Sequence, residues 1–205
     1  TTILSDSGLC GADNMGNGGM DRYYHGHSID QIRGFANTAT CGSKVVTANN
    51  KPSVKLDYTS GFYIPINTPF VLKGEGSDPD GDELTYCWEE FDKGPETPVD
   101  TPIGTAPLFR TFPAVKENFR YFPRYSSVLN NAGRIRAEQL PTYTRDLTFR
   151  LTVRDNNPLG GGTVFEEVEF KSFEGAGPFT VSFPNGGLST VWEMGKYEQV
   201  RWDVA

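Results

Sequence analysis

In the stretch LTFRLTVRD, residues 147–155, apolar and polar side chains alternate from Leu147 to Arg154. The apolar set is Leu147, Phe149, Leu151 and Val153, and the polar set is Thr148, Arg150, Thr152 and Arg154. Because successive side chains of a strand point to opposite faces, this period of two predicts a strand with one buried and one solvated face. The stretch therefore indicates an antiparallel sheet whose inner face forms the core.

Six further runs with strand-like composition surround this one. They cover residues 53–58, 61–66, 69–76, 83–90, 119–125 and 163–172. Seven short strands, with Trp88 in a central one, predict an immunoglobulin-like sandwich. The irregular stretch 91–145 is longer than a minimal sandwich needs, so we expect it to cross one edge of the fold.

The composition of the 205 residues agrees with a mainly β chain. Aromatic residues make up 13% of the sequence, and 23 glycines and 14 prolines provide turns. A net charge of -7 argues against a nucleic-acid partner, because a polyanion is bound by clustered Lys and Arg. No apolar stretch approaches the ~20 residues of a membrane-spanning helix, so no membrane span is predicted.

Residues 1–50 differ from the rest of the chain. A loop rich in Gly and Asn leads to a short amphipathic helix, expected at about residues 29–38, where Ser28 and Gln31 have the spacing of a capping box. Its apolar face would carry Ile29, Ile32, Phe35 and Ala36. One such helix cannot bury this face alone, so we expect residues 1–50 to belong to a larger body.

A second change in composition follows the seventh strand. Residues 177–205 contain a strand, a turn and a strand that ends at Trp202. These residues are too few for a sandwich, and we interpret them as the first strands of another β domain. The expected organisation is thus 1–50, a sandwich at 51–176, and 177–205.

The sequence GSDPDGDELTY holds the strongest candidate site. Asp78, Asp80 and Asp82 alternate around Gly81, and Asp155 and Asn156 follow the long alternating strand. Closely spaced oxygen ligands suit calcium, which takes six to eight oxygens. The alternative is that the Asp-Pro and Asp-Gly pairs only form turns.

No residue is assigned to catalysis. Adjacent residues of a strand point to opposite faces, so neither the pair Glu89 and Glu90 nor the pair Glu166 and Glu167 converges easily on one substrate. We expect these residues and Glu169 to belong to solvated strand faces instead. His25 and His27 are expected to cap or pack around the helix start rather than to bind zinc.

The run FRYFPRYSS, residues 119–127, interleaves aromatic residues with Arg120 and Arg124. Such a run lines a carbohydrate or peptide groove, or forms a buried edge in which arginine stems pack on rings. We favour the packed edge.

The chain has three cysteines. Cys10 and Cys41 bracket the first segment and form the simplest disulfide pair, which would place the protein in an oxidising compartment. Cys87 is then a small buried apolar residue or the partner of a cysteine outside this chain.

The ordered series of these motifs resembles one family. TILSDSGLCG at 2–11, DRYYHGHSIDQI at 21–32 and TCG at 40–42 resemble the end of the catalytic domain of secreted reprolysin-like zinc metallopeptidases of Bacteroidetes type. SDPDGDELTYCWEEFD at 77–92 and LPTYTRDLTFRLTVRDN at 140–156 resemble the PKD-like or immunoglobulin-like domain that follows it.

The resemblance has two departures. Leu4 stands where the family keeps the methionine of its methionine turn, and the H-E-x-x-H helix that binds zinc is absent from this chain. The helix would lie upstream of Thr1, so zinc is expected only there. The turn region and the Cys10–Cys41 disulfide are the features that carry over.

The resemblance implies a non-catalytic C-terminal accessory region of a secreted or cell-surface zinc metalloendopeptidase, with the upstream catalytic domain as its first partner. The region would support and space the catalytic domain, and would engage a protein substrate or a cell-surface component. The alternative is an independent adhesin or glycan-binding module stabilised by calcium. A third hypothesis is a homologue that no longer cuts, to which Leu4 lends support.

Overall fold

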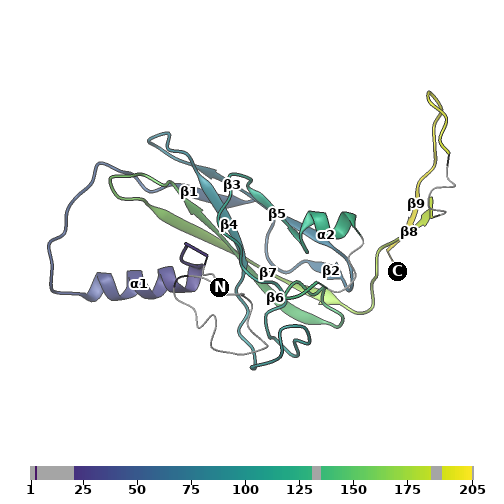
Figure 1. Ribbon diagram of the computed structural model, residues 1–205, viewed down its shortest axis with the longest axis horizontal. Coiled ribbons are helices and arrows are strands. Elements are labelled where there is room, and N and C mark those ends of the chain that lie inside the picture. Colours follow the sequence, from purple (N-terminus) through teal and green to yellow (C-terminus); the bar gives the residue numbers. More distant parts are fainter. Residues whose placement is uncertain (1–2, 4–20, 131–134, 186–190, 205) are drawn as a thin grey trace.

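The computed structural model describes residues 3, 21–130, 135–185 and 191–204, and within these ranges seven strands form two sheets that share one core (Figure 1). The first sheet has the order β1-β3-β5, with bounds Ser53–Leu56, Phe70–Ser77 and Phe119–Phe122. The second has the order β2-β7-β6-β4, with bounds Tyr63–Pro65, Thr163–Phe173, Arg145–Arg154 and Thr85–Glu90. All seven expected strands are present, and the prediction of a mainly β fold is confirmed.

Strand β6 is the centre of the larger sheet. It pairs antiparallel with β7 along its whole length, from Arg145 opposite Ser172 to Arg154 opposite Thr163, and with β4 on its other side. Strand β2 runs parallel to β7. Strand β4 is therefore an edge strand in space, although Trp88 within it is buried as expected.

The apolar face of β6 forms the core as its alternation predicts. The side chains of Leu147, Phe149, Leu151 and Val153 are fully buried. Phe149 stacks on Phe170 with ring centroids 5.5 Å apart. Gly74 of β3 lies against this face, and a Cβ there would stand 2.4 Å from Leu151 Cδ2, so the two sheets approach too closely for a larger residue.

The opposite face of β6 was expected in solvent, and this prediction is wrong for Arg150 and Thr152, which are buried. The Arg150 guanidinium lies between two rings, 3.6 Å from the centroid of Phe91 and 3.8 Å from that of Phe165. Its nitrogens also donate to Asp30 and Glu167. The face is covered because the N-terminal helix docks on it.

That helix, α1, spans Gly26–Thr38 and begins earlier than the expected residue 29. The predicted capping box does not form, because Ser28 lies inside the helix and its hydroxyl hydrogen-bonds the His25 ring. Instead the N–H of Gly26 donates to Glu89 Oε2 at 2.8 Å. A carboxylate from a distant strand thus serves the positive end of the helix, where unpaired N–H groups favour negative charge.

Most of the expected apolar face of α1 remains uncovered. Ile32 is 43% exposed and Phe35 is 73% exposed. The helix contacts the sheet through its first half, where Ile29, Asp30 and Arg33 lie against β6 and β7. Among the described residues, nothing buries the second half of its apolar face.

The stretch 91–145 crosses one edge of the sandwich and adds to the core through Ala106, Leu108 and Phe109. Strand β5 is shorter than the expected run 119–125. It ends at Phe122, and a short helix, α2, occupies Tyr125–Leu129.

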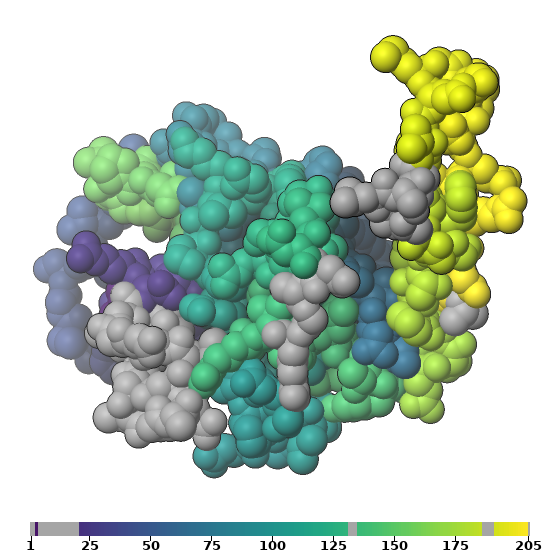
Figure 2. Space-filling model, turned by 45° about the vertical axis from the view of Figure 1, so that its right-hand side comes forward, coloured from purple at the N-terminus to yellow at the C-terminus, as the bar shows by residue number. Residues whose placement is uncertain are grey.

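The last two strands stand apart from the sandwich. Strand β8 (Thr180–Phe183) pairs antiparallel with β9 (Arg201–Asp203), as the sequence predicts for a strand, a turn and a strand. Figure 2 shows this hairpin projecting from one end of the molecule. Its side chains are mostly exposed, including Trp192 and Trp202.

Candidate metal centre

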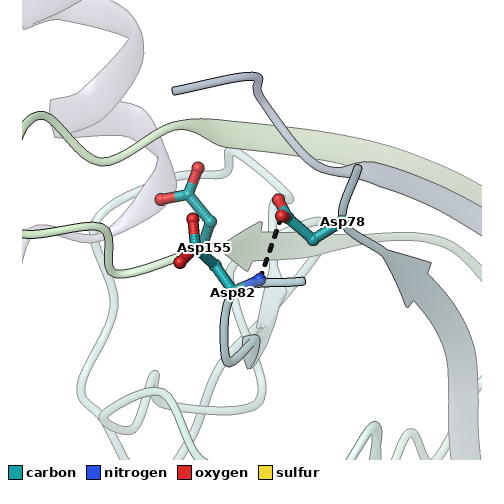
Figure 3. A group of neighbouring side chains, drawn as sticks. All are labelled: Asp78, Asp82 and Asp155. Carbon is teal, nitrogen blue, oxygen red and sulfur yellow. Dashed lines mark hydrogen bonds between the residues drawn. The ribbon is translucent and has the colours of Figure 1, made fainter. Parts of the chain in front are cut away.

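Three aspartates meet at one pole of the sandwich. Asp78 and Asp82 belong to the turn between β3 and β4, and Asp155 follows the last residue of β6 (Figure 3). Each offers one carboxylate oxygen, and these oxygens all lie within 4.8 Å of one another. Two segments more than 70 residues apart in sequence therefore converge, and three of the five residues that the sequence nominated for one site, Asp78, Asp82 and Asp155, lie together.

The turn is shaped by Asp78. Its Oδ1 accepts the backbone N–H of Asp80 at 2.8 Å and that of Asp82 at 3.1 Å. Gly81 has a φ of 79°, a left-handed conformation that glycine adopts without strain. This hydrogen bonding uses one oxygen of Asp78 and fixes the direction of the other.

The second oxygen of Asp78 is the most informative atom of the site. Oδ2 is buried and, in the part of the chain that the structure describes, has no hydrogen-bond partner. A buried acceptor without a partner costs free energy unless something else satisfies it. It lies beside two further carboxylates, and three like charges at this spacing repel one another unless a cation or protons neutralise them.

Asp155 is held rigidly. Its side chain is 2% exposed and accepts the N–H groups of Asn157 and Gly162 and the side-chain amide of Asn49. Burial raises the pKa of Asp155, but these hydrogen bonds outweigh burial and leave its pKa below the usual range. The group is therefore an anion at neutral pH, pre-positioned at the pole.

Two of the predicted ligands lie elsewhere. Asp80 is exposed, and its carboxylate accepts the backbone N–H of Asn50 at 2.6 Å and its side-chain amide at 2.9 Å. These bonds lower the pKa of Asp80. Asn156 has a φ of 55°, and its amide donates to the Glu83 carbonyl and to Thr85.

Two residues that the sequence analysis did not select complete the pole. Asn157 donates to Asp82 Oδ2 at 2.8 Å and to Asn49 Oδ1 at 3.2 Å. Asn157 lies beyond the end of β6, after the left-handed Asn156, so no strand period indicates it. Asn49 carries no comparable signal, because the segment before β1 reaches the pole only through the tertiary fold.

The donor set fits a hard cation. The converging atoms are carboxylate oxygens, which calcium and magnesium prefer over the nitrogen and sulfur ligands typical of zinc. With one orphaned buried oxygen among them, Asp78, Asp82 and Asp155 are the residues that would hold such an ion.

The prediction that Glu89 and Glu90 form a solvated face is wrong. Glu89 is 3% exposed and accepts from Gly26 and from the Thr111 hydroxyl. Glu90 Oε2 accepts the N–H groups of Leu108 and Phe109 at 2.6 and 2.7 Å. Both carboxylates are buried because helix α1 and the 91–145 stretch bring backbone donors to them. Glu166, Glu167 and Glu169 are exposed, as expected.

The other candidates from the sequence are Leu4, the three cysteines and the two histidines. Leu4 and Cys10 lie outside the described residues. Cys41 is exposed and Cys87 is buried, and neither forms a disulfide with a described residue, so the Cys10–Cys41 disulfide stays a prediction. Burial raises the pKa of Cys87 to about 12. The His25 and His27 rings lie 6.4 Å apart at the start of α1, and burial lowers the pKa of His25.

The run 119–127 divides between the two expected roles. Arg120 is largely buried, with its guanidinium over the rings of Phe112 and Phe122, as packing predicts. Phe119, Tyr121 and Tyr125 are exposed.

Comparisons with protein-family profiles, with curated proteins and with solved structures found no match to this chain. Within the described ranges, no helix is both long and apolar enough to cross a membrane.

Proposed function

We propose that this chain is the non-catalytic accessory region of a secreted zinc metalloendopeptidase. In this proposal a PKD-like or immunoglobulin-like sandwich, stabilised by calcium, holds residues 21–50 in a fixed orientation. The chain itself carries no catalytic zinc. Its role is to support the catalytic domain and to space it from its surroundings.

One observation carries the proposal: the segment that joins α1 to the sandwich is fastened to the candidate metal centre. Asn49 donates to Asp155, and Asn50 donates to Asp80. A cation at the pole would hold Asp155 in place, and because Asn49 is hydrogen-bonded to Asp155, it would so stabilise the path of the linker. That is the property expected of a spacer rather than of a freely jointed module.

The helix supports the same proposal. Helix α1 is capped by Glu89 and tied to Arg150, yet Ile32 and Phe35 face outward. A helix that is fixed to the sandwich on one side and exposes apolar side chains on the other is suited to contact a further domain. The strand order and buried Trp88 are the features that favour an immunoglobulin-like identity.

The test compares the full-length protein with residues 1–205 in a casein cleavage assay with zinc. We expect the full-length protein to cleave casein, to lose activity with a zinc chelator, and to encode an H-E-x-x-H helix upstream of Thr1. Residues 1–205 should not cleave. Proteolysis by residues 1–205 alone, or a full-length protein without such a helix, would overturn the proposal.

A second candidate function is an independent cell-surface adhesin that binds glycans. It is favoured by the exposed rings of Phe119, Tyr121 and Tyr125, because aromatic faces are suited to stack on sugars. A glycan array with residues 1–205 distinguishes it from the first, which requires no glycan ligand.

A further inference from the structure

Strand β5 has a free hydrogen-bonding edge. Among the strands that the structure describes it pairs only with β3, and the N–H of Gly74 donates to the carbonyl of Asn118. Because hydrogen-bonded and non-hydrogen-bonded pairs alternate along an antiparallel ladder, the N–H and C=O groups of Phe119 and Tyr121 point away from β3. Within the described ranges these four backbone groups make no hydrogen bond.

A cavity of about 330 Å³ lies beside this edge. Its lining includes Phe119 and Tyr121 of β5, Cys87 and Trp88 of β4, and Phe112 from the segment that joins these strands. The cavity thus occupies the gap between the edges of the two sheets. On the β4 side, Tyr86 already exchanges two backbone hydrogen bonds with Val115, so the unpaired edge is that of β5.

Exposed aromatic rings border the same edge. Phe119, Tyr121 and Tyr125 are 40%, 37% and 52% exposed, and the Tyr121 ring lies 5.7 Å from that of Phe119 and 4.8 Å from that of Tyr125. Proteins usually protect an edge strand with charge or cover it, because bare edges pair with other chains. An uncovered aromatic cluster on an edge therefore indicates an interaction site.

Two arginines, Arg120 and Arg124, and one exposed acidic residue, Glu117, line the cavity, and Arg110 lies close by. The guanidinium groups of Arg110, Arg120 and Arg124 lie 4.8, 4.7 and 4.0 Å from the centroid of the Phe112 ring. Two carboxylates pair with these three groups, since Glu138 is shared by Arg120 and Arg124, and Asp21 contacts Arg110. The Arg124 side chain is 52% exposed. It therefore offers an accessible positive charge on a chain whose net charge is -7.

We propose that this edge binds an extended peptide segment as an added strand. The backbone of the peptide pairs with Phe119 and Tyr121, an apolar side chain enters the cavity, and an acidic side chain meets Arg124. Strand addition uses main-chain hydrogen bonds for affinity and pockets for alternate side chains for specificity. The free backbone groups favour a peptide over a glycan, since a sugar would leave the regular spacing of N–H and C=O groups unused.

This inference goes beyond the proposed accessory function and does not depend on it, because the sandwich would bind the peptide whether or not a catalytic domain precedes it. Failure of the casein assay would overturn the accessory function alone, and failure of the peptide to bind would overturn strand addition alone.

The experiment measures binding of residues 1–205 to the fluorescein-labelled peptide Asp-Val-Phe-Val-Thr-Val by fluorescence anisotropy. Two analogues carry backbone N-methyl groups at odd or at even positions, with the side chains unchanged. Since a strand pairs through alternate residues on each edge, we expect one analogue to bind about tenfold more weakly and the other to bind as before. Equal binding of both analogues would overturn strand addition.

Peptide binding by variants of the protein tests the same proposal independently. Tyr121→Pro removes the outward N–H but no bond to β3, and proline is accepted on edge strands. It should bind more weakly than Tyr121→Ala, which keeps that N–H. Arg124→Gln should bind about fivefold more weakly, with Arg201→Gln on the distant hairpin as the matched control. Each variant is checked by thermal unfolding.

Other occupants give distinct results that would overturn the proposal. A chitin or cellulose oligosaccharide that binds this cavity while the peptide does not would assign it to glycans. A concentration-dependent dimer that Tyr121→Pro abolishes, without peptide binding, would assign the edge to a second copy of this chain.

Discussion

Arg150 and Asp30 lie 120 residues apart in sequence, and the guanidinium of one donates to the carboxylate of the other at 2.5 Å. The Arg150 side chain is 8% exposed, whereas that of Asp30 is 37% exposed. The pair joins the most central strand of the sandwich to the helix that precedes it. The position of α1 is therefore set by the same strand that forms the core.

The first prediction concerns this ion pair. Asp30→Asn removes one charge partner of Arg150 and leaves Glu167 in place, so α1 should detach more often. We expect faster tryptic cleavage at Arg33 and Lys44, with a free energy of unfolding of the sandwich within about 1 kcal/mol of wild type. Glu166→Gln, an exposed change on the same β7 strand, should leave the cleavage rate unchanged. Equal cleavage rates for both variants would contradict the prediction that this ion pair holds α1 on the sandwich.

Calcium should stabilise the chain through Asp78. At a hundred times its dissociation constant, calcium adds about 2.7 kcal/mol to the free energy of unfolding, which thermal melts with calcium or with chelator will detect. Asp78→Asn keeps the oxygen that accepts from Asp80 and Asp82 and replaces the free one by an amide. This variant should fold normally and lose the calcium shift, while the exposed Asp57→Asn should keep it. A shift that persists in Asp78→Asn would refute the site.

The pH dependence of stability should report Glu90. Burial, together with the neighbouring Asp92 carboxylate, raises the pKa of Glu90 well above its ordinary value. A raised pKa in the folded state means that the stabilisation is complete below the unfolded-state pKa and is lost as pH rises through the folded-state pKa.

Glu90→Gln carries no charge and keeps an acceptor for the N–H groups of Leu108 and Phe109. We expect the stability of the Gln variant relative to wild type to increase as pH rises from 4 to 8, measured by urea unfolding. Asp155, whose lowered pKa has the opposite effect, is common to both proteins and cancels in the difference. A difference that does not vary with pH would show that Glu90 is not the titrating group.

The core should depend most strongly on Phe149. Its ring is fully buried and lies within 6.1 Å, centroid to centroid, of the rings of Phe70, Phe109, Phe122 and Phe170. Phe149→Ala should lower the free energy of unfolding by about 3 to 5 kcal/mol, and Phe149→Leu by less. Leu159→Ala, at a position that is 77% exposed, should change it by less than about 0.5 kcal/mol. Similar losses at both positions would argue against this core.

How far the sequence predicts this molecule depends on how local each signal is. The alternation of residues 147–153 is a property of one strand, and it identified both the strand and its buried face. The burial of Glu89 could not be foreseen, because its donors, Gly26 and Thr111, come from a helix and a loop that only the tertiary fold brings together.

The candidate metal centre shows the same limit. Asp78, Asp82 and Asp155 could be selected because short spacing and strand ends are visible in sequence. Asn156 was selected for the same reason, but its left-handed backbone turns its amide toward Glu83. The contribution of Asn49 depends on where the linker runs, which no local pattern encodes.

The chain enters the sandwich along β1 at the metal-centre end and leaves along β7 at the opposite end (Figure 1). If the protein is pulled between its two flanking segments, the force acts along the strands rather than across them. The hydrogen bonds between β1 and β3, and those between β7 and β6, would then be loaded together in shear, not opened one at a time. Bonds that share a load in shear resist strand separation more than bonds that open one after another.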